Sequence, residues 1–341
     1  MNPVRVGVIG AGKWGMEHLE TFHGLPNAEL VAVADSSPER AKQAADMFGI
    51  PRWFTRHEDL CALAEVEAVS IVTPESEHLA PVLDAARAGK QMLVEKPMAA
   101  NVADARAMVD AASRTGVFLM PGHICRFENR YAVVHEKLRS GELGKVVSIQ
   151  ARRNRTKGNR RLYERAHPVF AAGIHDVDLL LWYATSRVQR VRGYHRNVAG
   201  NATPDVFWGM LEFENGVIGN LECTWLTPDA VGIPNDDMLQ VITDRGVARV
   251  DFVNCGIALW KESGFDLPDV CFAPRVRGRV EGALAAELSY FLECVATRQV
   301  PRAVTAADGL ESIRVAEALV ESAERGEDVV LERGANAAIR P

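Results

Sequence analysis

Short apolar runs alternate with amphipathic stretches of helical spacing from residue 4 to residue 121. Such runs are typical of strands that are buried on both faces of a parallel sheet, with the amphipathic stretches as covering helices. The pattern therefore predicts a parallel, doubly wound α/β sheet. We expect strands at residues 4–10, 30–34, 68–72, 91–95 and 117–120, and helices at 14–22, 38–48, 58–64, 76–88 and 102–115.

The alternation of strands and helices stops after residue 121. Several strand-like runs then follow one another with hairpin turn signals between them, which indicates an open, mostly antiparallel sheet in an α+β domain. We predict a first domain at residues 1–121, a second at 122–330 and a tail at 331–341 that is disordered from Gly334. The expected helices are 131–140, 173–183, 284–296 and 306–324, and the expected strands are 146–152, 188–196, 206–213, 217–225, 238–243, 247–252 and 257–261.

A glycine-rich turn follows the first strand, with the sequence Gly10-Ala11-Gly12-Lys13-Trp14-Gly15. In a GxGxxG turn between strand and helix, the first glycine permits the tight turn and the second lets the backbone approach a pyrophosphate. The third lets the helix pack on the strand, so that its free N–H groups face the phosphates. This turn alone is a weak signal, but its place between a strand and a helix predicts a dinucleotide site.

The second strand ends in Asp35, twenty positions beyond Gly15. An acid at this place can accept hydrogen bonds from the hydroxyls of an adenosine ribose, and it repels the 2′-phosphate of NADP. Ser36 and Arg40 follow closely and could instead bind that phosphate. NAD is therefore the favoured cofactor, and NADP stays an alternative.

Polar residues also follow the later strands of this domain. Thr73-Pro74 comes after the third strand with His78 just beyond, and Glu95-Lys96-Pro97 comes after the fourth. Ligands bind beyond the carboxyl ends of parallel strands, so we expect these residues to border the cofactor, with Glu95 on the nicotinamide side. Two charges at the end of a buried strand are costly unless they are used, although a surface salt bridge is the ordinary alternative.

The second domain carries the sequence Gly173-Ile174-His175-Asp176-Val177-Asp178 at the start of a predicted helix, and His167-Pro168 lies just upstream. Histidine exchanges a proton near neutral pH, as the oxidation of an alcohol requires. A single helical histidine is more often an interior side chain with satisfied hydrogen bonds. The acids beside His175 favour a substrate site that contains His175, Asp176 and His167.

The glycine turn, the EKP sequence and GIHDVDLLLW together resemble the Gfo/Idh/MocA oxidoreductases, over residues 4 to about 324. This resemblance implies a Rossmann domain followed by an α+β domain, and hydride transfer between NAD(P) and a hydroxyl carbon of a sugar, cyclitol or related compound. It also implies that Lys96 is the catalytic lysine and that His175 stands in the place of the acid/base. Many inositol-dehydrogenase-like members have an aspartate where this chain has Ala171, which casts doubt on inositol-like specificity.

A basic segment, Arg152-Arg153-Asn154-Arg155-Thr156-Lys157-Gly158-Asn159-Arg160-Arg161, follows the first strand of the second domain. A charge run is most often a solvated loop. In the resembled family, however, this strand and its loop approach the substrate, and arginine binds phosphate or carboxylate through a planar fork. We therefore keep an anionic substrate as a hypothesis, with Arg152, Arg155 and Arg126 as candidate contacts.

Composition narrows the class of protein. The chain has 341 residues and a net charge of −6, which argues against general nucleic-acid binding. No apolar run reaches membrane length, and we expect no leader and a soluble, cytoplasmic protein. The six cysteines are scattered without metal-ligand spacing, so we also expect no metal. An open sheet needs a cover, which predicts a homodimer or homotetramer. The rival hypothesis is a dinucleotide-binding sensor or assembly protein that has lost catalysis.

Overall fold

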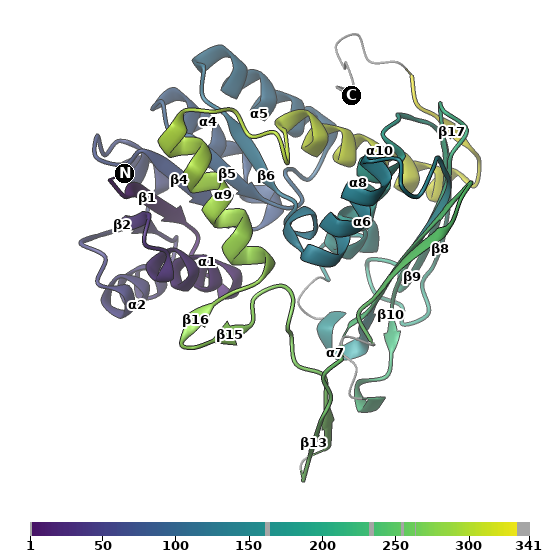
Figure 1. Cartoon of the computed structure of the whole chain (residues 1–341). Helices are drawn as coiled ribbons and strands as arrows, with labels where there is room; N and C mark the ends of the chain where they lie inside the picture. The colour runs from purple at the N-terminus through teal and green to yellow at the C-terminus, as the bar shows by residue number, and fades with distance from the viewer. Residues whose placement is uncertain (1, 161–163, 232–234, 254–255, 263, 333–341) are drawn as a thin grey trace. The chain divides into compact units, whose positions relative to one another are not determined.

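A computed structural model describes residues 2–160, 164–231, 235–253, 256–262 and 264–332. The expected disorder from Gly334 and the side chain of Arg161 lie outside the described residues. The chain forms two compact units, 1–128 with 270–310, and 129–269 with 311–341. Residues 270–310 therefore join the first unit, whereas the sequence analysis placed them with the second domain. Figure 1 shows the elements of both units.

The first unit contains a six-stranded parallel sheet in the order β3-β2-β1-β4-β5-β6. Because β1 lies between β2 and β4, the strand order reverses direction at β1, which is where such sheets bind ligands. The strand bounds are β1 Val4–Ile9, β2 Ala28–Ala34, β3 Arg52–Phe54, β4 Ala68–Ile71, β5 Gln91–Glu95 and β6 Leu119–Gly122. The predicted parallel α/β sheet is confirmed.

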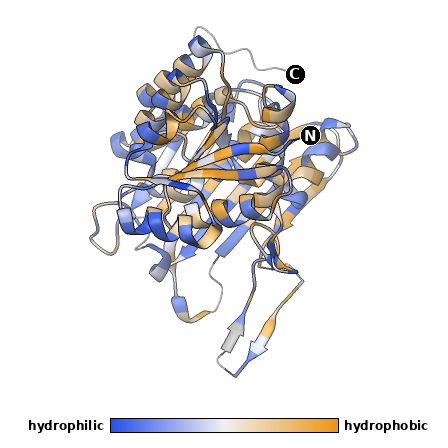
Figure 2. Ribbon diagram, turned by 90° about the vertical axis from the view of Figure 1, so that its left-hand side faces the viewer, coloured by the Kyte–Doolittle hydropathy of each residue, from blue (hydrophilic) through white to orange (hydrophobic). Residues whose placement is uncertain are grey.

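Helices cover both faces of this sheet (Figure 1). Helix α1 contacts α2 and α9, while α4 contacts α3 and α5. Their bounds are α1 Lys13–Gly24, α2 Pro38–Phe48, α3 His57–Cys61, α4 Leu79–Arg87, α5 Val102–Thr115 and α9 Ala283–Thr297, with 3-10 turns η1 Glu75–Glu77 and η2 Ile124–Phe127. A small hairpin, β15 Arg275–Val276 and β16 Arg279–Val280, precedes α9. Figure 2 shows both hydrophilic and hydrophobic residues along the helices of the protein, as burial of one side of a helix requires.

The second unit contains a seven-stranded mixed sheet in the order β12-β11-β7-β10-β9-β8-β17. The pair β7 and β10 is parallel, and the other pairs are antiparallel, so the expected mostly antiparallel sheet is confirmed. The bounds are β7 Val146–Thr156, β8 Val188–Arg196, β9 Val206–Phe213, β10 Ile218–Thr227, β11 Asn235–Thr243, β12 Val247–Asp251 and β17 Val329–Val330. The strand expected at 257–261 is shorter and forms a separate two-stranded sheet, β13 Leu259–Lys261 with β14 Gly264–Asp266.

Helices α8 and α10 pack on one face of this sheet. A side chain at Gly193 would collide with the backbone of Leu319 in α10, and one at Gly219 would collide with Leu180 in α8. These glycines therefore allow the helices to lie close to the strands. The bounds are α6 Asn129–Arg139, α7 Lys157–Arg160, α8 Ile174–Ala184 and α10 Ala306–Arg325, with a π-helical turn at Val169–Gly173 and the 3-10 turn η4 Asp229–Val231. In the part of the chain that is described, no helix is both long and apolar enough to span a bilayer.

Candidate functional site

The glycine turn joins β1 to α1 with a backbone that only glycine tolerates. Gly10 has a φ of 101°, and a Cβ on it would lie 2.6 Å from the carbonyl oxygen of Val72. A Cβ on Gly15 would collide with the carbonyl oxygen of Gly10. At Gly12, by contrast, a Cβ would meet no protein atom within 4 Å. Protein packing gives no reason for a glycine there, whereas close approach of a pyrophosphate does.

Helix α1 begins directly at this turn, with Gly12 as its N-cap and no side chain capping it. The first intrahelical bond runs from the Met16 amide to the Gly12 carbonyl, so the preceding amides have no partner within the helix. Lys13 and Trp14 are exposed in this first turn. The turn therefore offers N–H donors and a positive helix end, which together suit the pyrophosphate of a dinucleotide.

Asp35 is a buried carboxylate beside the glycine turn. It accepts hydrogen bonds from the backbone amides of Ala11 and Ser37, both at 2.8 Å, and from the Arg40 guanidinium at 2.7 and 3.1 Å. Burial alone would raise the pKa of Asp35, but the bonds from Arg40, Ser37 and Ala11 hold that pKa below its usual value. Asp35 is therefore an ionised acceptor, while Ser36 beside it is exposed.

His78 links the end of β4 to the EKP turn. Its Nε2 lies 2.9 Å from the carbonyl oxygen of Thr73, and its Nδ1 lies 3.1 Å from that of Pro97. The ring is buried, and burial lowers the pKa of His78. Pro74, between the two linked segments, is exposed. His78 thus fixes the backbone around the expected cofactor site from within.

Glu95 ends β5 as a buried carboxylate, while Lys96, the next residue, is partly exposed. The two side chains differ in burial, as successive residues of a strand do. Glu95 Oε1 lies 3.1 Å from Nε2 of His18 on α1, and Oε2 accepts the Lys96 backbone N–H at 3.0 Å. Glu95 is therefore tied into the interior and does not form the surface salt bridge that was the ordinary alternative.

In the second unit, His175 lies in the first turn of α8, directly after the π-helical turn. Such turns are frequent at functional sites because they insert a residue and re-aim its neighbours. His175 is partly buried, and Ala171 packs with Ala172 and Trp225 in a small apolar cluster. The position that carries an aspartate in many inositol-dehydrogenase-like proteins therefore belongs to the hydrophobic interior.

Asp176, the neighbour of His175, does not have the exposure of a substrate contact. Both its oxygens accept hydrogen bonds from Arg153, at 2.7 and 2.8 Å, and both residues are almost fully buried. Burial raises the pKa of Asp176, against the lowering effect of the Arg153 charge. Arg153 also contacts Asp237 at 3.0 Å. This network joins α8 to β7 and β11, and argues for a structural role of Asp176.

His167 lies in the same unit and accepts the Val169 backbone N–H at Nδ1, at 3.3 Å. Burial, together with the nearby His195, lowers the pKa of His167 to about 3. A ring with this pKa is neutral at physiological pH and is a poor proton acceptor. His175 is therefore the better candidate for proton transfer.

Acidic side chains pair with several arginines of the basic segment. Arg152 pairs with Asp236 at 2.8 Å, Arg155 with Asp237, and Arg160 with Asp205. In the first unit Arg126 is buried, with Nη1 2.9 Å from the Ala303 carbonyl oxygen and 3.3 Å from Asp308. These pairs offset the positive charge that motivated an anionic substrate.

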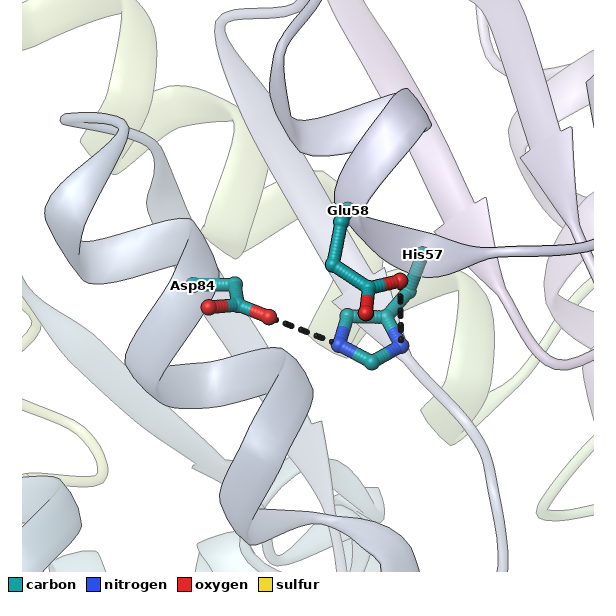
Figure 3. Close-up of side chains that lie close together, drawn as sticks. All are labelled: His57, Glu58 and Asp84. Carbon is teal, nitrogen blue, oxygen red and sulfur yellow. Dashed lines mark hydrogen bonds and ion pairs between the residues drawn. The ribbon is translucent and has the colours of Figure 1, made fainter.

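One further cluster, on the first unit, contains residues that often bind metals. His57 Nε2 lies 2.9 Å from Asp84 Oδ2, and Nδ1 lies 3.6 Å from Glu58 (Figure 3). The imidazole thus stands between the two carboxylates, one on each ring nitrogen. Asp84 also pairs with Arg87. This is an arrangement of hydrogen bonds and ion pairs, whereas a metal needs ligand atoms that converge on one point.

Comparisons with known proteins agree with this fold. Residues 4–123 match the family model described as "Oxidoreductase family, NAD-binding Rossmann fold", and residues 131–249 match the "GFO/IDH/MocA C-terminal domain". The chain is 28% identical to the "scyllo-inositol 2-dehydrogenase (NAD(+))" of Bacillus subtilis (strain 168), over 96% of each chain. It is also 28% identical to the "4-carboxy-2-hydroxymuconate-6-semialdehyde dehydrogenase" of Sphingobium sp. (strain SYK-6), over 78% of this chain and 84% of that one.

Among solved structures, the fold is similar to that of scyllo-inositol dehydrogenase from Lactobacillus casei, determined with NAD(H) and scyllo-inositol bound. The TM-score is 0.83, the sequence identity is 19%, and the alignment covers 96% of this chain and 99% of that one. At this identity the likeness supports the fold. It covers both units of the chain.

Proposed function

Because this chain belongs to the Gfo/Idh/MocA family of NAD-binding oxidoreductases, we propose that it transfers hydride between NAD and a secondary hydroxyl carbon of a sugar or cyclitol. One observation carries the proposal. A complete dinucleotide turn, Lys96 at the end of β5 and His175 at the start of α8 occur in one chain. A protein that only senses NAD would need the turn but neither proton-transferring residue.

The residues of the first unit fit the cofactor. The amides at the start of α1 would hold the pyrophosphate, and Asp35 would accept hydrogen bonds from the adenosine ribose. When bound, NAD supplies the hydride acceptor, which the protein itself lacks. His175, helped by Lys96, removes the proton of the substrate hydroxyl. Residues that border the cofactor in this proposal are Gly10, Ala11, Gly12, Lys13, Trp14, Gly15, Ser36, Arg40, Thr73, Pro74, His78 and Glu95.

We propose an uncharged substrate, because the candidate anion-binding arginines are paired. A carboxylated substrate would have to compete with Asp236 for Arg152 and with Asp237 for Arg155. Asp237 is buried, and drawing Arg155 away would remove one of its two arginine partners, which is costly. A neutral polyol requires no such exchange.

A substrate panel tests the function directly. Purified protein with NAD is mixed with inositol isomers, aldoses and matched carboxylated sugars, and formation of NADH is followed by its absorbance. We expect turnover of at least one neutral sugar or cyclitol, with lower kcat/KM for its carboxylated counterpart. Tight NAD binding with no turnover on any compound, in either direction, would instead support the sensor hypothesis.

We also propose that the protein forms a homodimer or homotetramer through the outer face of the mixed sheet. The face opposite α8 and α10 exposes Tyr194 by 51%, Trp208 by 42%, Met210 by 40% and Ile218 by 48%. Tyr194 and Trp208 are cross-strand partners on β8 and β9. Large apolar side chains grouped on an open sheet are typical of a subunit interface, and an identical sheet of a second copy provides a flat apolar partner.

Replacing Trp208 by glutamate should shift this protein toward monomer. The change puts a charge in the middle of the proposed interface but leaves the interior of the sheet intact, so the melting temperature of the monomer should change little. Light scattering at micromolar concentration measures the mass. Trp53→Glu, at an equally exposed tryptophan on β3, is the matched control and should keep the wild-type mass. A monomeric wild-type protein would refute the interface.

A further inference from the structure

A polar chain of three side chains lies inside the first unit, between β4, α1 and β5. His18 Nδ1 is 2.9 Å from Ser70 Oγ, and His18 Nε2 is 3.1 Å from Glu95 Oε1. His18 and Ser70 are 0% exposed, and Glu95 is 6% exposed. A buried carboxylate is costly unless hydrogen bonds and charge compensate it. His18 supplies that compensation from the core face of α1.

The chain of contacts continues from Glu95 to Lys96. Oε2 of Glu95 accepts the Lys96 backbone N–H at 3.0 Å, and the Trp14 side chain lies close enough to help lower the pKa of this carboxyl group. Gly122 on β6 lies against Oε1, where a Cβ would come within 2.9 Å. The Glu95 carboxylate thus has neighbours on α1, on β6 and in the backbone of Lys96. It connects the helix that follows the glycine turn to the backbone of Lys96.

Electrostatic interactions also connect Glu95 with His18 and Lys96. Burial would raise the pKa of Glu95, but the hydrogen bond and charge of His18, the nearby Trp14 side chain and the Lys96 charge hold that pKa below its usual value. Coupling between two charges is reciprocal, so the Glu95 carboxylate in turn stabilises the ammonium form of Lys96. The buried His78 also senses the charge of Glu95, while Trp14 and Gly122 carry no charge.

We propose that His18 is a positioning residue for Lys96. By bonding to both Ser70 and Glu95, it fixes the Glu95 carboxylate against the Lys96 turn, and this carboxylate sets the place of Lys96 and the ease with which it releases a proton. The inference rests on the proposed function, because proton transfer by Lys96 matters only in a dehydrogenase. It assigns a role to His18, which lies one helical turn beyond Trp14, packs edge-on against the Trp14 ring and reaches Lys96 through Glu95.

Five variants test the inference: His18→Leu, His18→Gln, Glu95→Gln, the double variant His18→Leu/Glu95→Gln and, as the matched control, His23→Leu. His23 is exposed near the end of the same helix. In His18→Leu the pKa of Glu95 rises, its negative charge is lost, and the pKa of Lys96 falls. We expect kcat to fall about 10- to 100-fold, as for small misplacements of a catalytic group. In the plot of kcat against pH, the limb that reports the titration of Lys96 should move to lower pH. NADH affinity and substrate KM should change less than about threefold.

The remaining variants separate positioning from folding. His18→Gln keeps a donor near Glu95 and should restore part of kcat, Glu95→Gln should reproduce the pH shift, and the double variant His18→Leu/Glu95→Gln should be no worse than Glu95→Gln. His23→Leu should match wild type. An unshifted pH profile in His18→Leu, or a loss of kcat explained wholly by a smaller folded fraction, would overturn the proposal.

A readout without turnover distinguishes this inference from the proposed function. The lysines are reductively methylated with a ¹³C label and titrated by NMR, with Lys96 assigned from the spectrum of Lys96→Arg. The pKa of Lys96 should be lower in His18→Leu than in wild type, whether or not a substrate is known. If the wild-type protein is inactive on the whole panel but the pKa of Lys96 still falls in His18→Leu, the proposed dehydrogenase function is refuted and the positioning role of His18 is supported. If Lys96 titrates identically in both proteins, the positioning role of His18 is refuted.

Discussion

Lys96→Ala and His175→Ala are each expected to lower kcat by about 10²- to 10⁴-fold, the range for a positioned acid or base. Lys96 projects from a turn whose backbone is held by Glu95, and His175 begins α8, so truncating either side chain leaves the glycine turn and Asp35 unchanged. NADH affinity should therefore stay within about threefold of wild type. Steady-state kinetics on the best panel substrate, with NADH titrated by fluorescence, measures both quantities.

Controls for this pair are residues of the same type outside the site. Lys42 on α2 forms an exposed pair with Asp46, and His57 lies between Glu58 and Asp84. Alanine at either position should leave kcat within about twofold, as surface changes away from a site do. If Lys96→Ala or His175→Ala retained near-normal turnover on the true substrate, its assigned role would be withdrawn.

Asp35→Ser is expected to raise the KM for NAD by about 10- to 100-fold, the factor that corresponds to lost hydrogen bonds to a charged acceptor. The same change should improve the use of NADP. Arg40 now donates two bonds to Asp35 and would become free to bind a 2′-phosphate. The measurement is the ratio of kcat/KM for NAD to that for NADP, compared with wild type.

The double variant Asp35→Ser/Arg40→Ala isolates the role of Arg40. It should lose the gain with NADP while keeping the weakened use of NAD. A wild-type protein that used NADP as well as NAD would contradict the assignment of Asp35. An Asp35→Ser variant with an unchanged cofactor ratio would contradict it as well.

The sequence predicted the parallel sheet because its strands are continuous apolar runs between helices with recognisable ends. Strand β3, Arg52–Phe54, was missed because it has only three residues and none of them is buried. Helix α4 was expected to begin at residue 76, but residues 75–77 form a 3-10 turn and the helix starts at Leu79. The local sequence pattern was sufficient to predict a helix or strand wherever that element buries a full face.

The local sequence pattern could not predict ion pairs and hydrogen bonds between residues that lie far apart in the chain. Arg152 and Arg155 were candidate contacts for an anionic substrate, and their carboxylate partners Asp236 and Asp237 follow more than 80 positions later, on the neighbouring strand. His18 was missed for the same reason. Helical spacing places His18 with Gly15, Leu19 and Phe22 on the core face of α1. Its contact with Glu95, however, depends on the tertiary fold.

Because residues 270–310 belong to the first unit, they affect the order in which the chain can fold during its synthesis on the ribosome. Helix α9 contacts α1 and β1, and Phe291 packs edge-on against Phe118 at 5.9 Å between ring centres. A nascent chain that ends before α9 leaves this apolar surface in water. The NAD-binding unit therefore completes its core only after the sheet strands β7 to β12 have been synthesised, and a fragment cut at residue 121 is expected to aggregate.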